Sequence, residues 1–276
     1  MGRVMTEPIG AQSSLWRRVM FTAFASTYFR RKVRTRDGVF EVYGSPGSYL
    51  KFAKVWATPV DPVHERFIRH WVDHNAVVWD IGANLGLFAF PAALKTTRGR
   101  VYMFEPDVEL GAYLLRSRRL SCNKRLDVAL LSVAISNVDG TAEFQISKFS
   151  RAMNKLRGAS PWHDREFVAD ETRLVCTMRI DTLSQTLVPP TVIKIDVEGA
   201  EMLVLEGGEA TISKYRPVLL IEGPNRLWNQ MGLYLNKHDY VLLDGATEHQ
   251  SPLKEPVWDT VAVPKEKFTS AATGPD

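Results

Sequence analysis

Residues 77–86 read Val-Val-Trp-Asp-Ile-Gly-Ala-Asn-Leu-Gly, and this stretch decides the fold. Its apolar, β-branched start predicts a buried strand that ends at Asp80, and the glycines that follow predict a sharp turn into a helix. Such strand-turn-helix units build doubly wound sheets, whose ligands bind at the carboxyl ends of the strands. We therefore expect a ligand to bind at Asp80, Gly82, Asn84 and Gly86.

The spacing of these residues distinguishes two classes of ligand. A dinucleotide pyrophosphate is usually bound by Gly-x-Gly-x-x-Gly at a helix N-terminus, whereas this chain has Gly82-x-Asn84-x-Gly86 after Asp80. The Asp80 carboxylate would repel a pyrophosphate but can pair with the cationic amino group of S-adenosylmethionine. Glu105 ends the next predicted strand about 25 residues later and suits the ribose hydroxyls of either cofactor. An NAD-dependent oxidoreductase therefore stays open as an alternative.

Strands and helices alternate after this stretch. Apolar, β-rich runs predict strands at residues 100–104, 128–135, 192–195, 218–221, 240–243 and 257–263. Apolar residues at helical spacing predict helices at residues 85–94, 108–120, 201–205 and 226–236. Pro91 is expected to kink the first of these helices, because proline removes a backbone hydrogen bond. The alternation predicts an α/β, Rossmann-like fold with a mostly parallel sheet and helices on both faces.

The N-terminal region departs from this pattern. Residues 13–31 place apolar side chains at helical spacing between basic pairs, which predicts an amphipathic helix that packs on the core or a second subunit, or lies on an anionic membrane. Residues 33–49 predict a small β hairpin, and Asp61 with Pro62 predicts a helix start. We divide the chain into an N-terminal appendage, a main domain and a flexible tail, over residues 1–60, 61–265 and 266–276.

The composition is that of a globular protein, with 45% hydrophobic and 24% charged residues among 276. The net charge of +4 reflects basic residues clustered before Asp37, so we do not expect nucleic acid as a partner. Cys122 and Cys176 have neither CxxC spacing nor a histidine cluster beside them, which argues against a zinc site or a disulfide framework. No signal peptide or membrane-spanning run is apparent, so we expect a cytoplasmic protein, either free or peripheral at the inner face of the membrane.

A third motif carries charge into a buried strand. Residues 193–201 read Ile-Lys-Ile-Asp-Val-Glu-Gly-Ala-Glu, and the alternation of side chains puts Lys194 and Asp196 on one face. Burying a charge is costly unless the charge has a partner or a function. The pair either only fixes the loop, or places Asp196 at the mouth of the pocket.

Together these motifs resemble the FkbM family of S-adenosylmethionine-dependent methyltransferases. The resemblance rests on DIGANLG at 80–86, FEP at 104–106, SNVDGTAEF at 136–144, IKIDVEGAE at 193–201 and VLEGG at 204–208. It implies a class I methyltransferase fold whose seven-stranded sheet has an antiparallel last strand. The usual activity is O-methylation of a sugar, glycolipid or natural-product hydroxyl.

The resemblance also assigns cofactor residues. Asp80, Gly82, Asn84 and Gly86 match the cofactor loop, and Glu105 matches the ribose-binding acid. By position, the neighbourhood of Ala134 to Asn137, which includes Ser136, should border the adenine. A non-catalytic methyltransferase-like binding protein would have lost Asp196 or the glycines, and this chain retains them.

Methylation of a hydroxyl benefits from a nearby base. Asp196 is the first candidate, Glu198 and Glu222 are the second, and His163 is a weaker one. His163 lies in residues 145–173, where periodicity fails and a lid or substrate-facing insertion is expected. A magnesium ion on Asp196, Glu198, Glu201 and Glu222 is an alternative route, but no His or Asn completes the set, and we predict no metal site.

Overall fold

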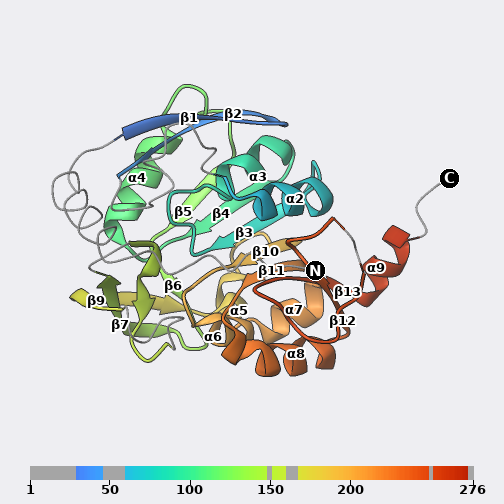
Figure 1. Cartoon of the computed structure of the whole chain (residues 1–276). Helices are drawn as coiled ribbons and strands as arrows, with labels where there is room; N and C mark the ends of the chain where they lie inside the picture. The colour runs from blue at the N-terminus through green and yellow to red at the C-terminus, as the bar shows by residue number, and fades with distance from the viewer. Residues whose placement is uncertain (1–28, 46–59, 148–150, 160–166, 249–250, 273–276) are drawn as a thin grey trace, which may run out of the picture.

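The computed structural model describes residues 29–45, 60–147, 151–159, 167–248 and 251–272. The strands of its central sheet are β3 Val77–Ile81, β4 Arg100–Phe104, β5 Val128–Leu131, β10 Val192–Ile195, β11 Val218–Glu222, β12 Tyr240–Asp244 and β13 Asp259–Pro264. They form a seven-stranded sheet in the order β12-β13-β11-β10-β3-β4-β5 (Figure 1). Neighbours are parallel except β13, which is antiparallel to β11 and β12. The predicted α/β sheet is confirmed, including its antiparallel last strand.

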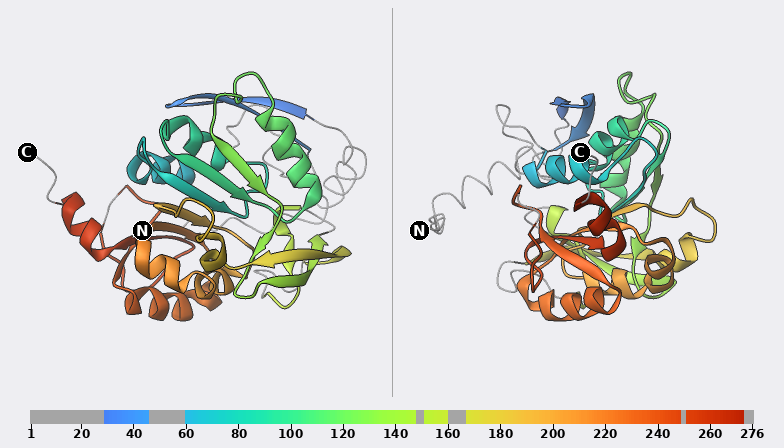
Figure 2. Two further views of the ribbon diagram at one scale, coloured as in Figure 1. Left: turned by 180° about the vertical axis from the view of Figure 1, so that it is seen from behind. Right: turned by 90° about the vertical axis from the view of Figure 1, so that its right-hand side faces the viewer.

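Helices cover both faces of this sheet (Figures 1 and 2). On one face lie α2 Pro62–Trp71, α3 Ala89–Lys95 and α4 Val108–Arg118, and on the other α5 Ile180–Leu183, α6 Glu201–Glu206, α7 Glu209–Tyr215 and α8 Trp228–Lys237. Consecutive residues of β3 point to opposite faces, so Val78 joins the apolar core under α2 to α4 and Trp79 joins the core under α5 to α8. Burial on both faces explains why the strand reads as a continuous apolar run.

A hairpin extends the first core. Strands β1 Phe29–Thr35 and β2 Gly38–Gly44 pair in antiparallel fashion near α4, slightly earlier than the predicted span of 33–49. Phe40 and Val42 are fully buried in the core that α3 and α4 share. Asn123 joins the hairpin to α4, because its Nδ2 donates to Glu41 O (2.6 Å) and Ser117 O (2.8 Å), and its Oδ1 accepts from Glu41 N (3.2 Å).

The segment predicted to be an irregular insertion instead contains a second sheet. Strands β6 Ala134–Ile135, β7 Gly140–Ser147, β8 Lys155–Leu156 and β9 Ala169–Met178 associate in the order β6-β9-β7-β8, with the short helix η2 Arg151–Met153 before β8. We expected residues 145–173 to be irregular. This expectation is wrong at both ends, because residues 145–147 belong to β7 and residues 169–173 belong to β9. Most of β9 is exposed, so its sequence lacks the apolar alternation that marks a half-buried strand.

Pro91 does not kink a helix. The predicted helix 85–94 begins only at Ala89, which puts Pro91 in the first turn of α3. Backbone N–H groups of a first turn have no partner within the helix, so proline is tolerated there. The expectation of a lost hydrogen bond is corrected accordingly.

The two ends of the chain also differ from the sequence-based division. The predicted tail from residue 266 begins as helix α9 Lys265–Ala272, in which Glu266 pairs with Arg216 (2.9 Å) and Lys267 Nζ donates to Arg216 O (2.6 Å). The predicted helix 13–31 ends in residues 29–31 that belong to β1, and the rest of it lies outside the described residues.

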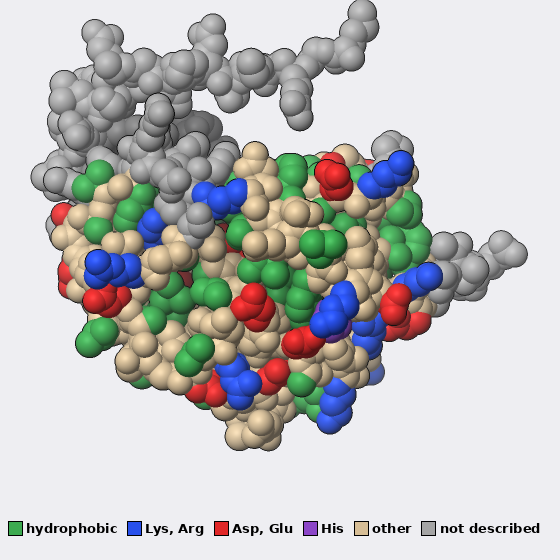
Figure 3. Space-filling model, turned by 90° about the horizontal axis from the view of Figure 1, so that it is seen from below, with side chains coloured by type: hydrophobic (Ala, Val, Ile, Leu, Met, Phe, Trp, Pro, Cys, Tyr) green, Lys and Arg blue, Asp and Glu red, His purple; other side chains and the backbone are tan. Residues whose placement is uncertain are grey.

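The surface seen in Figure 3 carries Asp and Glu side chains interspersed with Lys and Arg. On that face, the described residues present no continuous basic area of the kind that binds a nucleic acid backbone. Among the helices that the structure describes, none has the length and apolar character needed to cross a membrane.

We predict that Asn123→Ala lowers the free energy of unfolding by about 1–3 kcal/mol, because it leaves buried backbone groups of Glu41 without partners. Urea unfolding measures the change. Asn236→Ala, at an exposed position of α8, is the matched control and should change stability little. Equal effects of the two substitutions would show that Asn123 does not anchor the hairpin.

Candidate functional site

The loops after β3 and β10 cross in direct contact. A Cβ at Gly82 would lie 1.9 Å from the carbonyl oxygen of Asp196, and Gly82 has a φ of +80°. Both facts require glycine. The sequence suggested that Gly82 admits a ligand, whereas the closest approach is that of the Asp196 backbone. The first and third motifs are therefore interlocked at one edge of the sheet.

A buried ammonium group joins the same two loops. Lys194 Nζ lies 3.1 Å from Asp196 Oδ2 and 3.6 Å from Asp80 Oδ1, and it donates to Gly82 O at 3.1 Å. Burial disfavours the charged ammonium, but the carboxylates of Asp196 and Asp80 outweigh that effect and raise the pKa of Lys194. Lys194 therefore carries a positive charge at the crossing of the loops.

Two adjoining cavities open at this edge. One, of about 60 Å³, is lined by Glu105, Ala134 and Ile135 and is called the cofactor-side cavity. The other, of about 190 Å³, is lined by His64 and Glu222 and is called the acceptor-side cavity. Both are lined by Gly82, Asn84, Ala152, Asp196 and Glu198. The two spaces therefore share a wall built from the first and third motifs.

Glu105 defines the cofactor-side cavity. Its Oε2 accepts from Asn84 N at 2.8 Å, and its Oε1 accepts from Asp107 N at 2.9 Å. Burial raises the pKa of Glu105 to about 7, against the opposing effect of these two backbone donors. Asn84 has a left-handed φ of +49°, a conformation that is costly outside glycine and is concentrated at functional sites. A carboxylate held in this way can accept hydrogen bonds from two neighbouring hydroxyls of a ribose.

His64 and Glu222 form the far wall of the acceptor-side cavity. His64, from α2, places its Nε2 2.6 Å from Glu222 Oε1 at the end of β11. Burial opposes the imidazolium form, but Glu222 outweighs it and raises the pKa of His64. The ring of His64 also packs edge-on against Phe88, with centroids 5.3 Å apart. The side chain of Glu222 is thus held in one place by a residue distant in sequence.

Carboxylates crowd around the shared wall. Asp196 keeps 33% of its side chain exposed into the cavities, and burial raises its pKa against the pull of Lys194. Burial, followed by repulsion from Asp196, raises the pKa of Glu198 well above its usual value, and Glu198 has a left-handed φ of +54°. Burial raises the pKa of Glu201 to about 7. This edge of the sheet therefore combines strained backbone with perturbed acids, which is typical of functional sites.

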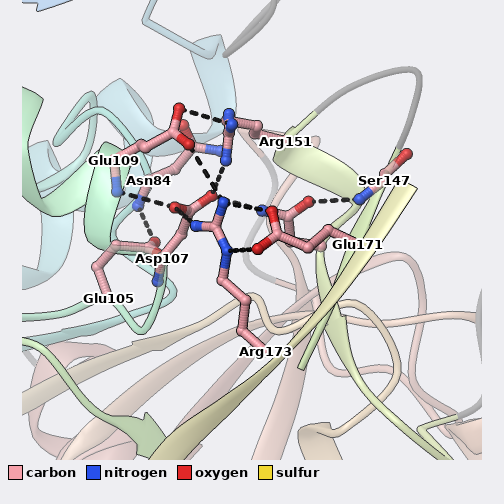
Figure 4. A network of polar contacts seen from close by, with 9 residues as sticks. Asn84, Glu105, Asp107, Glu109, Ser147, Arg151, Glu171 and Arg173 are labelled. Atoms are coloured by element: carbon pink, nitrogen blue, oxygen red, sulfur yellow. Dashed lines mark hydrogen bonds and ion pairs between the residues drawn. The ribbon is translucent and has the colours of Figure 1, made fainter. Parts of the chain in front are cut away.

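Asp107, which lies between β4 and α4, connects this part of the central fold to the second sheet (Figure 4). Asp107 is fully buried, and its Oδ2 accepts from Arg151 Nη1 (2.7 Å) and Asn154 Nδ2 (2.8 Å). Arg173, from β9, approaches Asp107 Oδ1 at 3.5 Å. Arg151 also pairs with Glu109 at 2.6 Å. Arg151 and Asn154 line the cavity.

Most predicted site residues meet at these cavities. Those that line one or both are Gly82, Asn84, Glu105, Asp196, Glu198 and Glu222. Asp80 is completely buried behind them against Lys194, Gly86 packs against Phe90, and Ser136 packs against Gly207. His163 lies outside the described residues. Within the described ranges no group of three His, Cys, Asp or Glu side chains has the arrangement of a metal site.

Sequence reasoning missed several residues of the site. His64 was part of a predicted helix with no chemical motif, and only the fold brings it to Glu222. Arg151 and Asn154 fell in the segment without periodicity. Asp107 follows the Phe-Glu-Pro motif and precedes a predicted helix, so its role as N-cap of α4 could have been found.

Comparison with known proteins identifies a family. The model for the methyltransferase FkbM domain matches residues 80–242, which is more than half of the chain. None of the curated proteins compared with the chain matches it.

Solved structures include similar folds at low identity. The methyltransferase FkbM from Methylobacillus flagellatus KT is 21% identical with a TM-score of 0.47, over 74% of this chain and 48% of that one. TYW2 of M. jannaschii in complex with AdoMet is 12% identical with a TM-score of 0.40, over 84% of each chain. The precorrin-6y C5,15-methyltransferase of Geobacter metallireducens GS-15 is 11% identical with a TM-score of 0.40, over 75% of this chain and 90% of that one. The chain spans about half the length of the first of these proteins.

We predict that the buried acids make the protein less stable as the pH rises. The folded-state pKa of Glu201 is raised from 4.5 to about 7, so its contribution to stability is present below pH 4.5 and is lost as the pH rises through 7. The loss is about 1.4 kcal/mol for each unit of pKa shift. Glu201→Gln should therefore weaken the fall in unfolding free energy between pH 5 and 8, measured by urea unfolding.

The exposed Glu65→Gln on α2 is the control for this experiment and should leave the pH profile as in the wild type. An unchanged profile in Glu201→Gln would mean that Glu201 is not responsible for the pH dependence.

Proposed function

Since the chain belongs to the FkbM family of S-adenosylmethionine-dependent methyltransferases, we propose that it transfers the methyl group to a hydroxyl oxygen of a sugar, glycolipid or small natural product. The family excludes the NAD-dependent oxidoreductase that the glycine-rich turn and Glu105 left open. The observation that carries the choice of a hydroxyl acceptor is the acceptor-side cavity, because it places carboxylates beside the cofactor-binding loop.

The residues of the cofactor-side cavity fit S-adenosylmethionine. Glu105 would hold the ribose hydroxyls, and the apolar side of the cavity at Val133, Ala134 and Ile135 would face the adenine. Asn84 Oδ1 is buried and has no hydrogen-bond partner among the described residues, which leaves an acceptor for a donor group of the ligand. When bound, the cofactor supplies an electrophilic methyl group on a positively charged sulfur.

Asp80 has a more indirect role than the sequence suggested. Its carboxylate is completely buried and lines neither cavity. Through Lys194 it fixes the cofactor loop and Asp196 relative to each other. We infer that Asp80 contributes to cofactor binding by holding the loop, and by adding negative charge below a cationic ligand.

In this proposal Asp196 would act on the acceptor. It lies at the wall between the two cavities, so a hydroxyl bonded to it would stand beside the cofactor loop. Asp196 would accept the proton of that hydroxyl while the methyl group is transferred to its oxygen and the bond between the methyl carbon and the sulfur breaks. The raised pKa of Asp196 makes it a stronger base than an ordinary aspartate. Alignment of the reactants and exclusion of water supply the rest of the rate.

Glu198 and Glu222 would select the acceptor. Carboxylates accept hydrogen bonds from neighbouring hydroxyls, and they repel phosphate or carboxylate groups. Glu222 is oriented by His64 for this purpose. An uncharged polyhydroxylated acceptor suits the cavity better than an anionic one. Contact of residues 13–31 with an anionic membrane or with a second copy of the chain belongs to the same proposal, since a glycolipid acceptor would be found at such a surface.

Our first functional prediction concerns cofactor affinity. Glu105→Ala should weaken S-adenosylhomocysteine binding by roughly tenfold or more, because a charge-assisted hydrogen bond contributes about 1.5–3 kcal/mol. For the wild type, affinity should rise with pH up to about 7 and then level off, because the carboxyl, whose pKa is raised to about 7, must lose its proton to accept two ribose hydroxyls. Calorimetry from pH 5.5 to 8 measures both effects.

The exposed Glu255→Ala is the control and should bind as the wild type does. The ribose assignment is wrong if Glu105→Ala binds S-adenosylhomocysteine normally or if the affinity is independent of pH.

The second functional prediction concerns catalysis. Asp196→Asn should lower methyl transfer by about 10²–10⁴-fold while S-adenosylhomocysteine affinity changes little. Transfer from a radiolabelled donor to a panel of hydroxylated sugars and glycolipids measures the rate, with the exposed Asp127→Asn as control. If chelation abolishes turnover and magnesium restores it, a metal ion assists Asp196. Near-normal turnover in Asp196→Asn would shift the role of base to Glu222.

A further inference from the structure

Part of the wall of the cofactor-side cavity comes from the second sheet and the residues that precede β8. This cavity is lined by Phe144 of β7, Arg151 of η2, Leu156 of β8 and Asn154, which lies between η2 and β8. Phe144 and Leu156 also share an apolar cluster with Ala134 of β6, which lines the same cavity. Residues 151–156 are therefore a built part of the cavity.

Asp107 fixes this wall to the cofactor-binding strand. It lies two residues after Glu105, and its backbone N–H donates to Glu105 Oε1 at 2.9 Å. Its buried carboxylate binds Arg151 and Asn154 at 2.7 and 2.8 Å (Figure 4). Asn154 in turn accepts from Ser147 N at 2.8 Å, which closes the turn on β7. One residue thus connects the ribose-binding acid with the wall.

Arg151, the charged side chain that this wall presents to the cavity, is paired. The guanidinium of Arg151 contacts both Asp107 Oδ2 (2.7 Å) and Glu109 Oε2 (2.6 Å). An arginine held by two carboxylates offers little net positive charge to a phosphate. The apolar side chains Phe144 and Leu156 present the kind of surface that a flat, uncharged base packs against. The wall therefore suits adenosine and disfavours a phosphorylated nucleotide.

We propose that residues 151–156, fixed by Asp107, are a binding element for the adenosine half of the cofactor and close the cavity over it. This inference rests on the cofactor assignment of the proposed function. It adds an element of ligand specificity to that function, because the wall recognises an unphosphorylated nucleoside. Binding of the nucleoside to the wall is coupled to its binding to Glu105 through Asp107.

Hydrogen exchange on the full-length wild type tests the proposal without a substitution. S-adenosylhomocysteine and adenosine alone should both slow exchange of the amides of residues 151–156, whereas adenosine 5′-monophosphate should have a much weaker effect. Residues 169–172, in the exposed half of β9, are the internal control and should exchange as before. Unchanged exchange at 151–156 when S-adenosylhomocysteine is bound overturns the proposal.

Ligand affinities of single-residue variants test the proposal quantitatively. Arg151→Ala and Asn154→Ala should each weaken binding of S-adenosylhomocysteine and of adenosine by about tenfold, because each removes a charge-assisted hydrogen bond to Asp107 that fixes the wall. Arg173→Ala is the matched control, because Arg173 approaches the same Asp107 (3.5 Å) and the same Glu109 (3.2 Å) but does not line the cavity. It should change affinity by no more than about twofold. Urea unfolding of each variant confirms that it is folded.

The outcomes separate this proposal from the proposed function. If the wild type binds neither S-adenosylhomocysteine nor S-adenosylmethionine, the cofactor assignment and this inference both fail. If it binds them and Arg173→Ala weakens binding as much as Arg151→Ala, the network only stabilises the fold and this inference alone fails. If adenosine 5′-monophosphate binds as tightly as adenosine, the assigned specificity is wrong.

Discussion

The buried ammonium of Lys194 is the interaction on which the rest of the site depends. It lies where the ends of β3 and β10 meet, and it holds Asp80, Asp196 and the carbonyl of Gly82 within 3.6 Å. Two carboxylates so close together would repel each other in a desolvated place, and a buried cation without them would be equally costly. The three charges are stable only together. This constraint explains why a strand that is otherwise apolar carries charge into its own end.

The same crossing makes the loops after β3 and β10 one unit. Gly82 leaves no room for a side chain against the backbone of Asp196, so a displacement of either loop displaces the other. Asn84 and Glu198, one in each loop, both have left-handed backbones. Strained conformations of this kind persist only where the surroundings hold them in place. Precise relative placement of the two loops is what an in-line transfer requires.

The fold and half of the site could be predicted from the sequence because they depend on local patterns. Strands buried on both faces read as apolar runs, and glycines and acids at their ends mark the ligand-binding edge, as for Gly82, Glu105 and Asp196. The second sheet could not be predicted, because most of β9 is exposed and its residues lack alternation. His64 was missed because its partner Glu222 is 158 positions away, and no local pattern reports such a contact. The sequence correctly predicted that Asp80 lies at the ligand-binding edge of the sheet. It could not predict that Asp80 is completely buried behind Lys194, because that burial depends on how the folded chain packs.

The crowding of acids on the acceptor side has a chemical consequence. Asp196, Glu198 and Glu222 line this cavity together with Lys194 and with His64, which is itself paired with Glu222. Burial and mutual repulsion raise the pKa of Asp196 and Glu198. The positive charge of Lys194 acts in the opposite direction and lowers the pKa of Asp196. A proton taken from a hydroxyl acceptor would reduce the repulsion among these carboxylates, so the cavity itself favours proton transfer to its wall. The arrangement that is costly for the folded protein is therefore also the one that would strengthen Asp196 in its proposed role as base.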